Sequence, residues 1–275
     1  MTWANFFFVS DIDGTLLTTD GRVTDRTLRT LSQTREKGHY VTLATGRSLH
    51  ATLPIVKQIG VNAHVITLNG AQVVDATGRT LMQKPLFKAP LEELCAQLEA
   101  QRYSYCLMTA DWFVVSEKAL STHVNSAFVK RKDVISRPVL ADFLQDAPQP
   151  VLKLSLRCPD QAAFESMLRL LVDADVYEIS CGERFSINLT ARGVTKWTGI
   201  QYVIDELSIT SSDVVAFGNG DNDLEMLRRA GRGYAVANAE ERVLRSYDRF
   251  IGTNDEDGVA AEMERIVENL SGQTA

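Results

Sequence analysis

The sequence of 275 residues predicts an α/β fold, in which a parallel sheet with helical crossovers is interrupted by an inserted α+β domain. Three observations lead to this prediction. Apolar runs typical of buried strands alternate with helical patterns over residues 4–69. This alternation stops from about Pro85 to Asn188 and returns after Gly193. Polar clusters also follow several of the apolar runs, where the carboxyl ends of parallel strands carry ligand sites.

The first part of the chain has the pattern of a β-α-β-α-β unit. The run ANFFFVS fits a strand buried on both faces, and Thr24 and Gly38 supply an N-cap and a stop for the helix that follows. This alternation favours parallel strands joined by helices. Strands are expected at 4–10, 39–45 and 63–69, and helices at 24–38 and 48–60.

The middle of the chain changes its pattern. Residues 70–84 predict a hairpin around Thr77-Gly78, and a second hairpin is expected on either side of Asp111. The proline-bearing stretch 137–150 is typical of a loop. We therefore expect an inserted cap domain at 85–189, within a discontinuous core domain formed by 1–84 and 190–275.

The last part of the chain returns to the parallel pattern. It predicts helices at 194–206, about 222–230 and 258–270, with the strand DVVAFGN at 213–219.

The composition is typical of a soluble globular protein, with 45% hydrophobic and 23% charged residues. A net charge of -6 argues against binding nucleic acid by phosphate neutralisation. No stretch approaches the ~20 apolar residues of a membrane span, and the N-terminus lacks the basic region of a signal peptide. The four cysteines have no CxxC spacing and are expected as buried thiols in a reducing cytoplasm. The oligomeric state is left open.

Asp11 and Asp13 stand directly after the first predicted strand. In extended backbone, the side chains of residues i and i+2 project to the same side, so the carboxylates of Asp11 and Asp13 repel each other if they are buried without a partner. A divalent cation relieves this repulsion, and Mg²⁺ prefers carboxylate and phosphate oxygens. The alternative is a solvated Asp-Gly turn with Asp13 as a cap.

Three further clusters follow other predicted strands or open a helix. In LATGRS, Thr45 can donate a hydrogen bond, and Gly46 lets backbone N–H groups approach an anion, although an ordinary helix cap with a surface Arg47 fits as well. Lys196 begins a predicted helix and is by itself an ordinary surface charge. GNGDND carries several metal-type oxygen ligands, and its carboxylates would repel a dinucleotide pyrophosphate.

The ordered set of DxDGT, the Thr of ATGR, the Lys of GVTK and GNGDND resembles the haloacid dehalogenase-like (HAD-like) superfamily. It resembles most closely the Cof-type phosphatases, which have a Rossmann-like core and a large cap between the second and third motifs. The resemblance covers essentially the whole chain, including LNGA before the insert and NDEDGVA near the end.

The resemblance implies a role for each matching residue. Asp11 would be the nucleophile that forms an aspartyl-phosphate, and Asp13 would protonate the leaving alcohol and then activate water. Thr45 and Lys196 would hold the phosphoryl group. Further phosphate or substrate contacts would come from Gly46, Arg47, Asn188 and Asn222. The ligands of Mg²⁺ would come from Asp11, Asp13, Asn219 and Asp223.

Two positions depart from the family pattern. Asn219 stands where the family has an aspartate on the metal, so we expect an amide ligand and weaker Mg²⁺ binding, with Asp223 or Asp221 as alternative main ligands. Trp197 stands where a small residue often follows the lysine. It is expected either to pack in the core or to narrow the mouth of the site.

The cap is expected to close over the site and select the leaving group. Candidate contacts in its turns, each also readable as an exposed loop residue, are Asp111, Trp112, Glu183, Arg184 and Asn188.

The predicted function is Mg²⁺-dependent hydrolysis of small phosphorylated metabolites, such as sugar phosphates. The alternatives are a phosphosugar mutase and a non-catalytic phosphometabolite-binding module.

Overall fold

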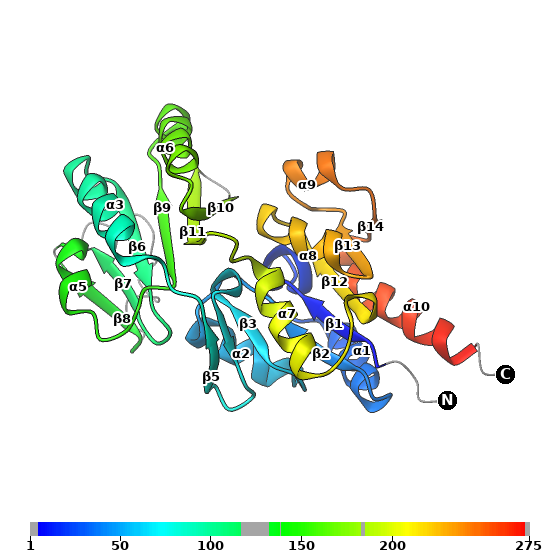
Figure 1. The fold of residues 1–275 in the computed structure, drawn as a ribbon. Coiled ribbons are helices and arrows are strands. Elements are labelled where there is room, and N and C mark those ends of the chain that lie inside the picture. The colour runs from blue at the N-terminus through cyan, green and yellow to red at the C-terminus, as the bar shows by residue number, and fades with distance from the viewer. Residues whose placement is uncertain (1–4, 117–131, 138, 183–184, 273–275) are drawn as a thin grey trace.

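The computed structural model describes residues 5–116, 132–137, 139–182 and 185–272. Glu183 and Arg184, two of the candidate substrate contacts, lie outside these residues. The fold is α/β, as predicted, with a parallel sheet in the core and a separate mixed sheet in the inserted cap (Figure 1).

The core sheet has five parallel strands in the order β14-β13-β12-β1-β2. β1 lies between β12 and β2, and all four of its residues are buried, as the unbroken apolar run predicts. A parallel bridge between Ala44 and Ile66 continues the sheet to β3. The strands are β1 (Phe7–Ser10), β2 (Tyr40–Leu43), β12 (Val214–Gly218), β13 (Arg232–Val236) and β14 (Phe250–Ile251).

Helices cover both faces of this sheet. Phe8 and Phe217 point to one face and pack against α1, α2 and α10, whereas Phe7 and Ala216 point to the other and pack against α7, α8 and α9. This opposite direction of neighbouring residues follows from the pleat of the strands. The helices are α1 (Asp25–Glu36), α2 (Leu49–Ile59), α7 (Lys196–Glu206), α8 (Leu224–Arg229), α9 (Glu241–Ser246) and α10 (Gly258–Gly272).

Most predicted core elements are present at nearly the expected positions. Thr24 caps α1 by accepting a hydrogen bond from the Thr27 backbone N–H, as predicted. The hairpin expected at 70–84 is formed by β4 (Gln72–Val74) and β5 (Thr80–Gln83). β3 (Val65–Thr67) pairs antiparallel with β4, so it belongs mainly to this small three-stranded sheet.

The cap contains a six-stranded sheet in the order β10-β11-β9-β6-β7-β8, with three described helices on one face (Figure 1). The hairpin expected around Asp111 is formed by β6 and β7. The strands are β6 (Ser104–Met108), β7 (Phe113–Ser116), β8 (Val134–Arg137), β9 (Lys153–Arg157), β10 (Tyr177–Gly182) and β11 (Ser186–Ala191). The helices are α3 (Lys88–Ala100), α5 (Leu140–Asp146) and α6 (Gln161–Ala174).

The prediction of a loop at 137–150 is wrong, because the helix α5 occupies much of this stretch. Leu140, Phe143 and Leu144 are spaced i, i+3, i+4 and are buried in the cap core, so apolar packing outweighed the proline signal. The predicted boundary at residue 189 falls within β11, and we propose that the cap extends to the end of that strand.

The four cysteines are free thiols, of which Cys95, Cys106 and Cys158 are buried, as expected. No helix in the described part of the chain has the length and apolar character needed to span a bilayer.

Candidate active site

The carboxyl ends of β1, β2 and β12 meet at a cavity of about 440 Å³ beneath the cap. The segments around residues 11–13 and 219–223 therefore lie on the same edge of the sheet. Most of the predicted site residues line this cavity. Its lining is formed by Asp11, Asp13, Gly14, Thr45, Gly46, Arg47, Lys153, Asn188, Asn219, Gly220, Asn222 and Glu240.

Lys196 links two buried carboxylates at the base of the site. Its Nζ donates to Asp11 Oδ1 and to Asp223 Oδ1, each at 2.6 Å, and the lysine is only 1% exposed. Burial raises the pKa of Asp11 to about 7, against the opposing attraction of the Lys196 ammonium. Burial also favours a neutral lysine, but Asp11 and Asp223 outweigh it and raise the pKa of Lys196. The three groups form one ionic unit that holds Asp11 in place.

The second oxygen of Asp223 is also engaged. Asp223 Oδ2 accepts hydrogen bonds from the backbone N–H groups of Asn219 at 2.8 Å and Gly220 at 2.9 Å. Both carboxylate oxygens thus hold protein donors, and these contacts favour a positioning role for Asp223 over metal ligation. Asp221 points elsewhere, because its Oδ2 accepts from the Cys181 backbone N–H and from Arg242.

Oxygen atoms converge at the Asn219 side chain. The amide end that faces the turn after β1 lies 2.9 Å from the Asp13 carbonyl oxygen, 2.9 Å from Thr15 Oγ1 and 3.2 Å from Asp11 Oδ2. With nitrogen at this end, the amide donates to these oxygens. With oxygen at this end, Asn219, Asp11 and the Asp13 carbonyl gather three oxygens that suit a cation.

This oxygen set fits Mg²⁺. Octahedral ligands at Mg²⁺ distances stand about 2.9 Å apart, close to the separations found here. The set supplies one side-chain carboxylate, Asp11, with a carbonyl and an amide. Among the described residues, no three His, Cys, Asp or Glu side chains form an alternative metal cluster.

Asp13 and Arg47 form an ion pair at the mouth of the cavity. Arg47 Nε donates to Asp13 Oδ2 at 2.7 Å, and Arg47 Nη2 donates to Asp13 Oδ1. The Asp13 side chain is 60% exposed, so it is open to a leaving group or water that enters from the cap side. Thr45 is buried beside this pair, and its Oγ1 accepts from the Arg47 backbone N–H at 3.1 Å.

Gly46 lies where the core and the cap approach closely. A Cβ at this position would lie 2.8 Å from Asn69 Oδ1 and 3.2 Å from Lys153 Nζ. The glycine therefore leaves room for a cap side chain to enter the site.

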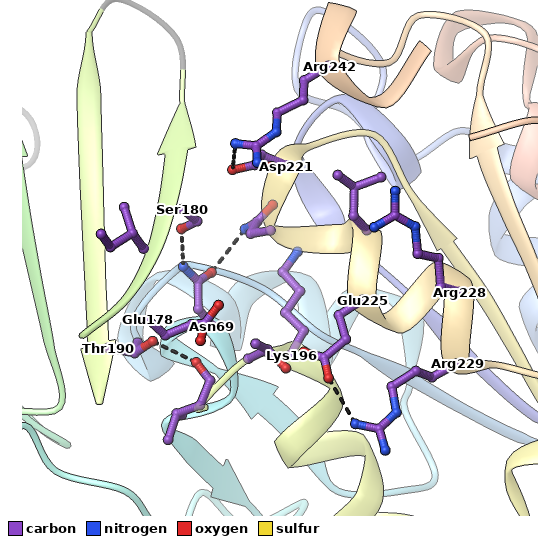
Figure 2. A pocket seen from close by; sticks show the side chains of 15 residues that line it. Asn69, Glu178, Ser180, Thr190, Lys196, Asp221, Glu225, Arg228, Arg229 and Arg242 are labelled. Atoms are coloured by element: carbon purple, nitrogen blue, oxygen red, sulfur yellow. Dashed lines mark hydrogen bonds and ion pairs between the residues drawn. The ribbon is translucent and has the colours of Figure 1, made fainter. Parts of the chain in front are cut away.

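Asn69 connects the core to the cap. It accepts a hydrogen bond from Asn222 Nδ2 at 3.0 Å. It also donates one to Ser180 Oγ of β10 at 3.3 Å, as Figure 2 shows. Asn69 has a left-handed backbone, with φ of 57°, which aims the side chain into the gap. The predicted phosphate contact Asn222 is therefore part of the joint between core and cap.

Two further cavities adjoin the site. One, of about 340 Å³, lies between β10 and α8 and shares Asn222 with the first cavity. Lys196 also lines it (Figure 2). The other, of about 670 Å³, shares Gly46 and Arg47 with the catalytic cavity and is bounded on the cap side by Met108 and Phe113. Through Arg47 it adjoins the Asp13–Arg47 ion pair.

Of the remaining candidate residues, only some lie at the site. Asn188 lines the cavity that contains Asp11, whereas Asp111 and Trp112 are not among its described lining residues. Trp112 instead packs against the cap core. Trp197 is buried among core side chains, with the Arg229 guanidinium 5.3 Å from its ring centre, which favours the packing role.

Lys153 and Asn69 were not among the residues predicted from the sequence. A lysine inside the apolar strand pattern VLKLSLR was a usable signal, because charges are rare at strand positions that the fold buries. Asn69 was visible only as part of LNG, whose left-handed backbone is a feature of the folded chain.

A family model for haloacid dehalogenase-like hydrolases matches residues 8–263. The chain is 28% identical over 263 residues to the stress response protein YhaX of Bacillus subtilis strain 168, covering 92% of this chain and 90% of that protein. It is 27% identical over 267 residues to the 5-amino-6-(5-phospho-D-ribitylamino)uracil phosphatase YitU of the same organism, covering 93% and 95%.

Solved structures show the same fold. A haloacid dehalogenase-like hydrolase from B. subtilis superimposes with a TM-score of 0.83 at 23% identity, covering 94% of this chain and 98% of that one. A HAD subclass IIB sugar phosphatase gives a TM-score of 0.81 at 22% identity, covering 95% and 99%. The family model, the curated relatives and the shared fold agree, and the chain belongs to the haloacid dehalogenase-like hydrolases.

Proposed function

We propose that this HAD-type phosphatase hydrolyses small phosphorylated metabolites, with Asp11 as nucleophile and Mg²⁺ as cofactor. The observation that carries the proposal is that Asp11 and the Asn219 oxygen cluster line one cavity, while Lys196 holds Asp11 from below by a buried ion pair. A cytoplasmic location, expected from the sequence, is part of this proposal.

In the first step, a carboxylate oxygen of Asp11 attacks phosphorus as the bond to the leaving oxygen breaks. Asp13 delivers a proton to the leaving alcohol. Arg47 now pairs with Asp13, and an arriving phosphate offers Arg47 a second anionic partner. That exchange would free Asp13 to take up a proton from solvent, and this is the proton that Asp13 gives to the leaving oxygen.

In the second step, water attacks the phosphorus of the aspartyl-phosphate. Asp13 accepts a proton from this water, and the bond from phosphorus to the Asp11 oxygen breaks. Inorganic phosphate leaves and the Asp11 carboxylate is restored. Lys196 balances the charge that returns to Asp11, because its Nζ lies 2.6 Å away.

Asp11, the Asp13 carbonyl and Asn219 would hold the Mg²⁺. When bound, the ion would neutralise charge on the phosphoryl group during transfer. Lys196 and Thr45 would complete the electrostatic surroundings of that group.

The substrate class rests on the adjoining cavities and on the relatives. The cavity of about 670 Å³ beside Arg47 has space for a metabolite-sized leaving group. Sugar phosphates and 5-amino-6-(5-phospho-D-ribitylamino)uracil, the substrates named for two of the similar proteins, are the first to test. A binding module without turnover is the second candidate, and Asn219 in place of a metal-binding aspartate is the observation that favours it.

A panel of metabolite phosphates assayed with Mg²⁺ and with EDTA tests the proposal. Asp11→Asn should lower kcat by at least about 10³-fold, because the amide cannot attack phosphorus. Asp205→Asn, on the exposed side of α7, is the matched control and should keep wild-type turnover. Wild-type turnover in Asp11→Asn would rule out the covalent step, and phosphate binding without release in the wild type would favour the module.

A further inference from the structure

Lys153 is a buried cation that the cap contributes to the catalytic cavity. It begins β9, is 5% exposed, and its Nζ donates to the Gly46 carbonyl oxygen across the core–cap gap at 2.9 Å. Gly46 directly follows Thr45, so Lys153 reaches the predicted phosphate-binding segment from above. The residue lines the same cavity as Asp11.

The direction of Lys153 follows from strand alternation. Leu154 and Leu156 pack into the cap core, which places Lys153 and Ser155 on the opposite face of the sheet. On the neighbouring strand β11, Asn188 pairs with Ser155 and also lines the cavity. The cap therefore turns a polar strip toward the site.

Burial leaves Lys153 with more donors than acceptors. An ammonium group has three N–H donors, and the Gly46 carbonyl takes one of them. No carboxylate of the described residues lies within ion-pair distance of Nζ. Burial lowers the pKa of Lys153 to about 8, with weaker effects from Cys106, Lys196 and Asp11. The lysine is thus still mainly protonated at neutral pH, at a cost in desolvation that an anionic ligand would offset.

We propose that Lys153 is a substrate-binding residue, which contacts the phosphate group from the cap side and completes the anion site only when the cap is closed. The inference rests on the proposed function. Phosphate dianion would then face Lys196 from the core and Lys153 from the cap. Substrate binding and cap closure would be coupled through the same ammonium group.

Three substitutions separate the charge of Lys153 from its hydrogen bond to Gly46. Lys153→Met removes both the charge and the hydrogen bond, Lys153→Gln can keep a hydrogen bond to Gly46 without charge, and Lys153→Arg keeps the charge. Lys88→Met removes an exposed lysine of the cap helix α3 and is the control. Each variant is titrated with inorganic phosphate in the presence of Mg²⁺, and kcat and KM are measured on the best ester of the panel.

Lys153→Met and Lys153→Gln should each weaken phosphate binding at least about tenfold, equivalent to about 1.4 kcal/mol. Lys153→Arg should bind phosphate more tightly than either, and Lys88→Met should match the wild type. Melting temperatures of Lys153→Met and Lys153→Gln should not fall below that of the wild type, because a buried charge is removed.

Wild-type phosphate affinity in Lys153→Met would overturn the inference. So would rescue by Lys153→Gln alone, because the lysine would then only tether Gly46. The proposed function fails separately, if wild-type protein releases no phosphate from any ester. In that case, loss of phosphate binding in Lys153→Met would still support the contact with the anion.

Discussion

At the scale of single residues, the Asn219 amide determines the charge of the proposed metal site. Its side chain meets the Asp13 carbonyl and Asp11 Oδ2, where an aspartate would add a second negative charge. An amide oxygen is a neutral ligand, so the site attracts a divalent cation less strongly.

Asn219→Asp should therefore lower the Mg²⁺ concentration for half-maximal activity by roughly tenfold. Titration of phosphatase activity with MgCl₂ measures this value. Asp223→Asn keeps one oxygen to accept from the Asn219 and Gly220 backbone N–H groups but loses the acceptor for Lys196. It should lower kcat and leave the Mg²⁺ requirement nearly unchanged. The opposite pattern would assign the metal to Asp223.

Lys153 also gives the folded state a pH dependence. The pKa of Lys153 is about 8 in the folded protein, against 10.5 for an ordinary lysine in the unfolded chain, so the folded state disfavours the protonated lysine. The resulting loss of stability is fully present below pH 8 and disappears as the pH rises toward 10.5. Cys106, Lys196 and Asp11 are the charged or titratable neighbours that modify this effect.

Lys153→Met should therefore raise the free energy of unfolding at pH 7 by at most about 3 kcal/mol, reduced by about 1 kcal/mol for the lost hydrogen bond to Gly46. The difference from the wild type should shrink between pH 8 and pH 10.5. Urea unfolding at several pH values measures it. A difference that stays constant over this pH range would show that folding does not lower the pKa of Lys153.

At the scale of elements, the start of α7 is fixed by its contact with Gly70. Gly70 has a φ of +88°, and a Cβ there would lie 1.8 Å from the Thr195 carbonyl oxygen. Thr195 immediately precedes Lys196, so the LNG turn sets the position of the lysine that holds Asp11.

Gly70→Ala should lower the free energy of unfolding by about 2–4 kcal/mol and reduce kcat, because α7 must shift away from the turn. Gly193→Ala is the matched control. Gly193 also has a positive φ, of +73°, but a Cβ there meets nothing within 4 Å. Only the backbone strain of about 1 kcal/mol is expected in the control. Denaturant unfolding and kcat are measured for both variants. Equal losses of unfolding free energy in Gly70→Ala and Gly193→Ala would contradict the steric explanation.

The elements also show what the sequence could predict. β1, β12 and the capped α1 were predictable, because long apolar runs and an N-cap threonine are local signals. α5 was not, because its apolar spacing is short and lies between prolines. β13, α9 and β14 were missed because none of them carries a long apolar run or a side-chain helix cap.

At the scale of the whole molecule, the order of the motifs predicted which segments would meet. Asp11, Thr45 and the 219–223 loop share one edge of the sheet because parallel strands end there, and Lys196 reaches this edge from the start of α7. The contribution of Lys153 could not be foreseen in this way. Its distance from Gly46 depends on how the cap folds over the core, which the spacing of motifs does not specify.

The path of the chain through the cap bears on whether one cap can be exchanged for another. The groups proposed to break and form bonds all lie outside residues 85–189, whereas Lys153 and Asn188 reach the cavity from within that segment. A graft of a foreign cap would thus leave the reaction centre whole while replacing the surface that receives the leaving group. A donor cap without a cation at the position of Lys153 would give a chimera that keeps its reaction-centre residues but binds phosphate more weakly.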